Sequence, residues 1–157
     1  MAFENAKKHL EQFGLSDRVR EFSQSSATVE LAAQALGCEP ARIAKSLTFM
    51  VGGEPVMVVT AGDMKVDNAK YKAEFGTKAK MLTPAEVDEL IGHSVGGVCP
   101  FGIKDGVRVF LDNSLKRFDR VFPACGSGNT AVELTVDELE KCSGCEKWVD
   151  VCKNISA

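Results

Sequence analysis

The chain has 157 residues, 45% of them hydrophobic and 26% charged, which is enough to bury a core and ordinary for a globular protein. No apolar run approaches the roughly 20 residues that a membrane-spanning helix needs, and the N-terminal residues lack the apolar core of a signal peptide. We therefore expect a cytoplasmic protein of one domain over 1–157, with no membrane partner and a net charge, −3, that does not by itself indicate nucleic-acid binding.

Helical and extended patterns alternate in the first half of the chain. Thr28 can cap a helix that Gly37 ends, since hydroxyl side chains favour helix starts and glycines favour the position after the last turn. Gly52-Gly53 separates two apolar runs and predicts a hairpin. The predicted elements are a helix over 3–13, a strand over 19–22, a helix over 29–36, and strands over 47–51 and 55–59.

The second half continues the alternation. Thr83 and Thr135 each begin a capping box, and Pro84 occupies the first helical position after Thr83. Because strands and helices interleave without regular β-α-β alternation, we expect a compact α/β domain with a mixed, largely antiparallel sheet. The predicted elements are helices over 67–75, 83–92 and from 135 onward, and strands over 107–111, 121–122 and 131–134.

The most distinctive motif is a glycine-rich loop from Gly92 to Gly102. Its glycines allow the backbone to approach a ligand, and its proline stiffens the turn. Such a loop presents main-chain N–H and C=O groups, so it suits a site for a polar ligand, although plain turns are also rich in glycine. The candidate ligand-binding residues in it are His93, Gly96, Gly97, Val98, Cys99 and Pro100.

Four segments become informative when taken together: Cys38–Leu47, Gly97–Gly102, Asp112, and Gly126-Ser127-Gly128. In this order they resemble the YbaK/prolyl-tRNA-synthetase-associated family of editing domains, with the likeness strongest over 28–139. The resemblance implies a barrel-like sheet with helices outside. It also implies a deacylase that removes wrongly attached amino acids from tRNA without a cofactor. Mischarged tRNA is then the partner, and prolyl-tRNA synthetase or another synthetase is a second candidate.

The resemblance also implies roles for single residues. Lys45, just before the strand predicted over 47–51, could be an ordinary snorkelling lysine. The resemblance places it in the site, where its ammonium would hold a phosphate or ester oxygen of the tRNA 3′ end. Backbone N–H groups over 97–99 could stabilise an oxyanion. Asp112 could orient a substrate amine or a ribose hydroxyl, or simply start a turn. Gly126, Ser127 and Gly128 could form a second wall of the site, or a hairpin turn.

The six cysteines leave several functions open. Cys99 could be a nucleophile, but no base lies beside it in the sequence, so a role in lining the site is favoured. Cys142 and Cys145 have a C-x-x-C spacing that could bind zinc or carry redox chemistry. No histidine lies near to complete a zinc site, so we expect reduced thiols and no metal.

Three functions therefore compete: an aminoacyl-tRNA deacylase, a non-catalytic tRNA- or nucleotide-binding module on the same fold, and a thiol redox protein.

A lysine-rich middle, from Lys65 to Lys80, could contact a phosphate backbone or could be a solvated helix face. The small residues of the glycine loop predict a small acyl group such as alanine, cysteine or serine. Some relatives carry a tyrosine where this chain has Glu21-Phe22-Ser23, so a hydroxyl is missing and the acyl preference could differ.

Overall fold

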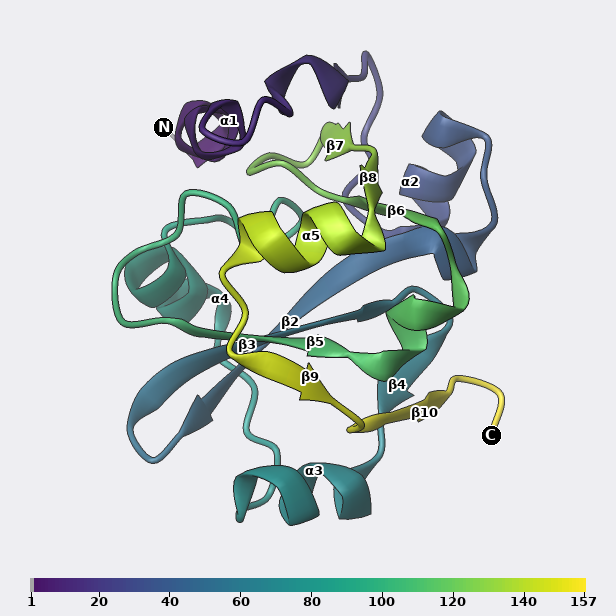
Figure 1. Ribbon diagram of the computed structural model, residues 1–157. Helices are drawn as coiled ribbons and strands as arrows, with labels where there is room; N and C mark the ends of the chain where they lie inside the picture. The colour runs from purple at the N-terminus through teal and green to yellow at the C-terminus, as the bar shows by residue number, and fades with distance from the viewer. Residues whose placement is uncertain (1) are drawn as a thin grey trace.

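A six-stranded sheet at the centre of the molecule determines where the other elements lie. The computed structural model describes residues 2–157, and its central strands follow the order β8-β6-β2-β3-β5-β9 (Figure 1). The strands are β1 (Val19–Glu21), β2 (Ile43–Val51), β3 (Glu54–Ala61), β4 (Met64–Val66), β5 (Arg108–Asp112), β6 (Arg120–Pro123), β7 (Thr130–Val132), β8 (Leu134–Thr135), β9 (Lys147–Val149) and β10 (Cys152–Asn154).

Helices pack against this sheet from both sides. Figure 1 shows α1 and α5 on one side and α3 on the other. Within residues 2–157, no helix is long and apolar enough to span a membrane. The helices are α1 (Ala2–Glu11), α2 (Val29–Leu36), α3 (Asn68–Phe75), α4 (Pro84–Glu86) and α5 (Val136–Ser143), and the short 3₁₀ or π turns are η1 (Ser16–Arg18), η2 (Pro40–Arg42), η3 (Val87–Ile91) and η4 (Asn113–Arg117).

The pairing of the strands confirms a mixed sheet. β2 pairs antiparallel with β3, and β6 pairs antiparallel with β8. The other neighbours, β2–β6, β3–β5 and β5–β9, are parallel. Two further antiparallel ladders join β1 to β7 and β4 to β10, so four of the seven pairings in the described chain are antiparallel. The predicted α/β class, with a curled sheet surrounded by helices, is confirmed.

The predicted helix ends are also confirmed. The Thr28 hydroxyl accepts a hydrogen bond from the N–H of Leu31, and Gly37 ends α2 in the left-handed conformation with φ of 69°. Both capping boxes, at Thr83 and Thr135, form as expected. The helix after Thr83 is wound differently from a plain α-helix, because it continues as the π turn η3 before it ends at Gly92.

Three details of the sheet correct the sequence-based expectations. β2 begins at Ile43, because its first two residues pair with β6, so Lys45 lies inside the strand and not before it. The segment around Gly126 is not a hairpin turn, since β6 pairs with β2 and β8 while β7 pairs with β1. The short strands β4, β9 and β10 were not predicted, because three-residue strands carry too little alternation to recognise.

Two apolar clusters fill the two faces of the sheet. Met57 and Val59 of β3 belong to a large cluster that includes residues of α1 and α5. Val56 and Val58 of the same strand belong to a second cluster, under Tyr71 of α3. Side chains alternate between the two faces along a strand, so β3 is buried on both sides. The hairpin of β2 and β3 is therefore a rigid support for anything built on the exposed edge of β2.

Candidate functional site

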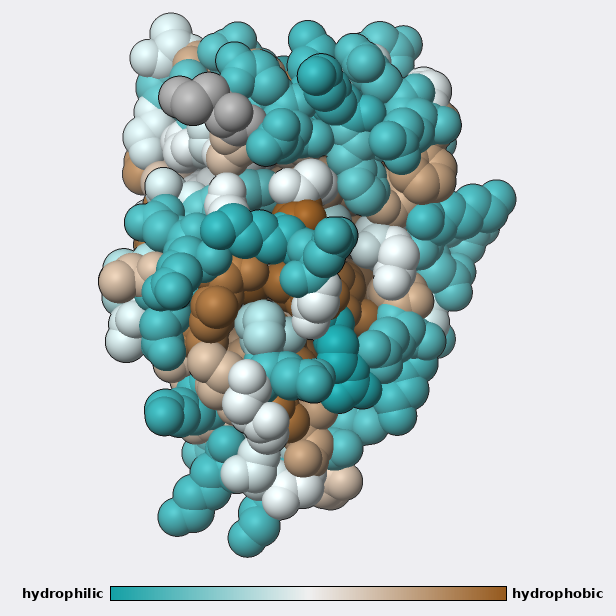
Figure 2. All heavy atoms as spheres, turned by 90° about the vertical axis from the view of Figure 1, so that its left-hand side faces the viewer, coloured by the Kyte–Doolittle hydropathy of each residue, from teal (hydrophilic) through white to brown (hydrophobic). Residues whose placement is uncertain are grey.

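A cavity of about 220 Å³ lies against β2, between the start of α2 and the glycine loop. Figure 2, which views the molecule from the side of α4, shows apolar atoms in a hollow ringed by polar side chains. Most of the lining residues are small or apolar, several carry hydroxyl groups, and Lys45 is the only ionisable one. The lining residues are Ser26, Ala27, Thr28, Val29, Ala32, Ile43, Ala44, Lys45, Ser46, Thr48, Met81, Leu82, Val87, Val95, Gly96, Val98, Phe122, Ala124, Thr130 and Ala131.

The cavity lies where the edge of β2 lacks a neighbouring strand. β6 pairs with β2 only at Ile43 and Ala44, and the next contact on this edge is the bridge between Phe49 and Met81. Between these points Ser46 borders the cavity, and its buried Oγ has no hydrogen-bond partner among residues 2–157. Buried polar atoms in proteins are nearly always paired, so an unpaired hydroxyl in a cavity wall suits contact with a ligand.

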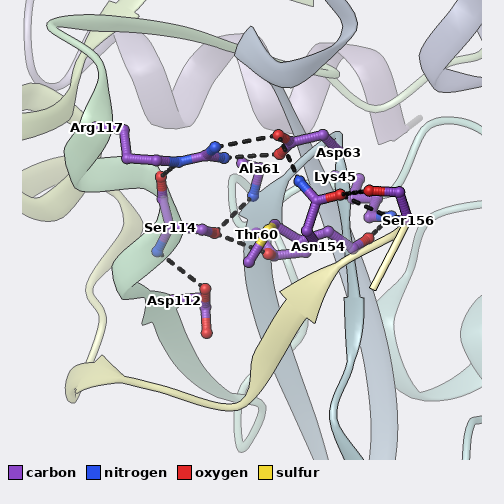
Figure 3. A network of polar contacts seen from close by, with 10 residues as sticks. Lys45, Thr60, Ala61, Asp63, Asp112, Ser114, Arg117, Asn154 and Ser156 are labelled. Atoms are coloured by element: carbon purple, nitrogen blue, oxygen red, sulfur yellow. Dashed lines mark hydrogen bonds and ion pairs between the residues drawn. The ribbon is translucent and has the colours of Figure 1, made fainter.

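Lys45 borders the cavity, but its ammonium is engaged elsewhere. Side chains alternate along β2, so Lys45 leaves the strand on the face opposite to Ser46. Its Nζ donates a hydrogen bond to the carbonyl of Met64, and Figure 3 shows it near Asp63. Burial lowers the pKa of Lys45 below its ordinary value of 10.5, although the neighbouring acidic groups oppose this shift. The half-buried ammonium is thus held by one carbonyl at the margin of the cavity.

The glycine loop contributes Gly96 and Val98 to the cavity, but Gly97 has a packing role. A Cβ on Gly97 would lie 2.5 Å from the backbone N of Ser127, so the absent side chain allows two loops to pack together. The N–H of Gly97 donates to the Ser94 carbonyl at 3.0 Å. The N–H of Cys99 donates to Nδ1 of His93 at 3.3 Å. Of the three N–H groups over 97–99, only that of Val98 has no partner in the described chain.

Three residues of the loop that were predicted to bind substrate are buried in the core instead. Cys99 is 0% exposed and packs in the large apolar cluster, and burial raises the pKa of its thiol far above the ordinary value. His93 is 1% exposed, burial lowers its pKa, and its Nδ1 is taken by Cys99. Pro100 is buried as well. They are not among the residues that line the cavity.

The segment from Gly126 to Gly128 supports the cavity wall without lining it. Gly126 donates its N–H to the Gly97 carbonyl at 3.0 Å, and the Gly128 carbonyl accepts the N–H of Ser26 at 2.7 Å. The Ser127 hydroxyl is hydrogen-bonded within its own turn, with the side chains of Asn129 and Thr130. This segment thus joins the glycine loop to the strand-to-helix segment that does line the cavity.

Asp112 is a structural residue at the end of β5. It is 1% exposed, and its carboxylate accepts the N–H groups of Ser114 and Val151, each at 3.0 Å. Both oxygens therefore have partners on the chain, and Asp112 is not among the residues that line the cavity. The turn-forming alternative for this residue is the one the geometry supports.

Cys142 and Cys145 are not among the residues that line the cavity. Burial raises the pKa of Cys142 to about 12, and the pKa of Cys145 is also raised, chiefly by burial. Neither thiol is therefore activated as a nucleophile. Among residues 2–157, His, Cys, Asp and Glu do not gather in any group of three or more that could hold a metal ion.

Sequence reasoning missed the residues on the other two sides of the cavity. Ser26 and Thr28 come from the start of α2, and Met81 comes from the segment before Thr83. One signal was available on β2: Ala44, Ser46 and Thr48 form an alternating row of small side chains, as expected where a strand faces a cavity. The contribution of α2 depends on tertiary packing that a single sequence does not reveal.

Fold and cavity together define an α/β domain with a small, largely apolar pocket at the open edge of a strand. The chain belongs to the aminoacyl-tRNA editing domain family, whose model matches residues 23–142. A solved structure described as a candidate trans-editing enzyme for prolyl-tRNA synthetase superposes with a TM-score of 0.87, at 29% identity and 98% coverage of both chains. The predicted family, and with it a place in tRNA editing and translation fidelity, is confirmed.

Two curated relatives show the range of proteins to which this chain is similar. The uncharacterized protein YwhH of Bacillus subtilis is 51% identical over 155 residues, which cover 98% of this chain and 99% of YwhH. The proline–tRNA ligase of Lactiplantibacillus plantarum is 26% identical over 138 residues, or 87% of this chain. The match covers only 24% of that ligase, so the chain corresponds to one part of the larger enzyme.

Proposed function

We propose that this protein is a trans-acting deacylase that hydrolyses the ester of mischarged tRNA, with a tRNA(Pro)-type substrate carrying alanine, cysteine or serine. The family and the trans-editing neighbour support aminoacyl-tRNA deacylation in general. The similarity to proline–tRNA ligases supports the choice of tRNA. The size and lining of the cavity support a small acyl group.

The observation that carries the proposal is that the cavity has few groups able to act as a nucleophile, acid or base. Its lining contains no carboxylate, imidazole or thiol, and Lys45 is its only ionisable residue. Its volume of about 220 Å³ is below the roughly 300–1,000 Å³ of pockets for drug-sized ligands. An aminoacyl ester is already activated, so a site that positions one water and polarises one carbonyl suffices. This lining suits such a reaction better than covalent catalysis.

In the proposed reaction, water adds to the acyl carbon, the ester C–O bond breaks, and the ribose oxygen leaves with a proton. The N–H of Val98 is free to donate to the developing oxyanion. The Ser46 hydroxyl is free to hold the substrate amine or carbonyl. Lys45 has a flexible stem, so its ammonium can exchange the Met64 carbonyl for a phosphate or ester oxygen of the RNA.

Rates of hydrolysis with a panel of esters test this proposal. We expect turnover of tRNA(Pro) charged with alanine, cysteine or serine, and little with leucine or phenylalanine, because the apolar wall excludes large side chains by steric clash. Lys45→Met keeps the stem but removes the charge, so it should abolish turnover while the protein stays folded. Equal rates for alanyl and phenylalanyl esters would refute the selectivity. Binding of tRNA without hydrolysis of any ester would leave the non-catalytic module as the function.

A further inference from the structure

Lysines gather on one side of the molecule, on α3 and the segment that follows it. Lys72, Lys78 and Lys80 are exposed, and none of them forms an ion pair with another described residue. Their neighbours behave differently. Lys70 pairs with Asp150 at 3.1 Å, and Lys147 pairs with Glu74 at 2.7 Å. The acidic groups around α3 are thus already engaged, and the three free lysines leave a local positive charge on a protein whose net charge is −3.

Two of these lysines, Lys72 and Lys78, border a groove beside α3. The groove is lined by Asn68, Ala69, Lys72, Lys78 and Ala79. From there the chain continues through Lys80, whose carbonyl accepts the N–H of Met50 at 2.9 Å. The next residues, Met81 and Leu82, line the cavity itself. The segment that carries Lys78 and Lys80 is therefore fixed to the edge of β2, and the residues directly after it line the cavity.

A second observation on the neighbouring ladder points to an anion. β4 and β10 place Lys65 directly opposite Lys153. Like charges at directly opposite positions destabilise a ladder, so this pair costs the fold stability. α3 begins immediately after β4, and the N–H of its cap residue, Asp67, donates to the Val151 carbonyl. The like-charge pair and the three free lysines thus belong to neighbouring elements.

We infer that Lys72, Lys78 and Lys80 form a phosphate-binding strip for the acceptor stem of the tRNA whose 3′ end occupies the cavity. The inference rests on the proposed function for the position of that 3′ end. The strip suits a polyanion because its charges lie on α3 and on the segment directly after it, and form no ion pair within the described chain. A nucleic-acid stem that ends in the cavity has a regular phosphate backbone beside it, which matches this arrangement.

The test compares two triple variants that remove the same charge. Lys72→Gln, Lys78→Gln and Lys80→Gln remove the strip. Lys7→Gln, Lys8→Gln and Lys141→Gln are the matched control, on α1 and α5 across the sheet. The Kd for uncharged tRNA is measured at several KCl concentrations. Because each neutralised phosphate contributes about 0.7–0.9 to the salt slope, we expect the strip variant to lose roughly 2–3 units of slope. The control should keep the wild-type slope.

A substrate without a stem separates this inference from the proposed function. With alanyl-adenosine, the strip variant should keep the wild-type rate, whereas its rate with alanyl-tRNA should fall at least tenfold at low substrate concentration. A strip variant with wild-type Kd and salt slope would overturn the inference, as would equal losses in the control. Loss of binding to anionic vesicles or to a synthetase, with tRNA binding intact, would overturn it too. If the wild-type protein binds tRNA but hydrolyses no ester, the proposed function fails. The comparison of salt slopes then still shows whether the three lysines bind the tRNA phosphates.

Discussion

Gly97→Ala should destabilise the protein by forcing two loops apart. The added Cβ would lie 2.5 Å from the N of Ser127 and 2.7 Å from the carbonyl carbon of Gly126, and both neighbours are backbone atoms. Backbone cannot rotate away as a side chain does, so the loops must separate. The sequence suggested that the loop's glycines allow a ligand to approach, but a methyl group on Gly97 would clash within the protein. Activity should still fall, because the displaced segment holds Ser26 in the cavity wall.

Overpacking of this kind typically costs about 1–3 kcal/mol. In a chain of this size, each kcal/mol lowers Tm by roughly 2–4 °C. Gly128→Ala is the matched control, because its Cβ would meet only the Cβ of Ala27 at an ordinary 3.5 Å. Urea denaturation of both variants gives the free energy of unfolding. We expect Gly97→Ala to be less stable than wild type by about 2 kcal/mol and Gly128→Ala to lie within about 0.5 kcal/mol. Similar midpoints for the two variants would refute the packing argument.

Three further outcomes follow from the burial of single groups. Cys99→Ser should retain turnover in the folded fraction, because the buried thiol does not border the cavity; complete loss of activity in a folded variant would restore the nucleophile hypothesis. As the pH rises, the activity should fall below pH 10.5, because burial lowers the pKa of Lys45 and the ammonium loses its proton. In Lys45→Arg this alkaline loss of activity should move to higher pH, measured after subtraction of uncatalysed hydrolysis. Ser46→Ala should leave the stability unchanged or slightly raised, since it removes an unpaired buried hydroxyl. The same variant should raise KM for small aminoacyl-tRNAs, and an unchanged KM would show that Ser46 is not part of the site.

The sequence predicted the fold well wherever the signal was local. The caps at Thr28, Thr83 and Thr135 each depend on residues within one helical turn, and all of them form. The hairpin at Gly52-Gly53 is similarly local. The parallel pairs of β3 with β5 and of β5 with β9 join segments far apart in sequence, so their order could not be deduced from spacing.

The candidate site was harder to predict, because glycine and buried polar residues have structural uses as often as functional ones. Gly97 was singled out for ligand approach, yet it allows one loop to approach another. Gly126 was predicted to form a wall of the site or a hairpin turn, yet it lies against the backbone of Ala2 and Phe3 in α1. Asp112 looked like a substrate-orienting carboxylate, yet it satisfies two backbone N–H groups. A single sequence shows that such residues are special. It does not show whether the partner they need is a ligand or another part of the same chain.

Hydrogen-bond partners make that distinction, and they reduce the candidate site to few atoms. Folding uses the N–H of Gly97, the N–H of Cys99 and the carboxylate of Asp112 completely. In the described chain it leaves the buried Ser46 hydroxyl without a partner, and the Val98 N–H forms no hydrogen bond; both residues line the same cavity. A polar group that is kept unpaired beside a cavity costs stability, and that cost is offset only when a ligand binds. In the proposed reaction, the ester would therefore meet one donor on β2 and one on the glycine loop, and Lys45 would become the third on leaving the Met64 carbonyl.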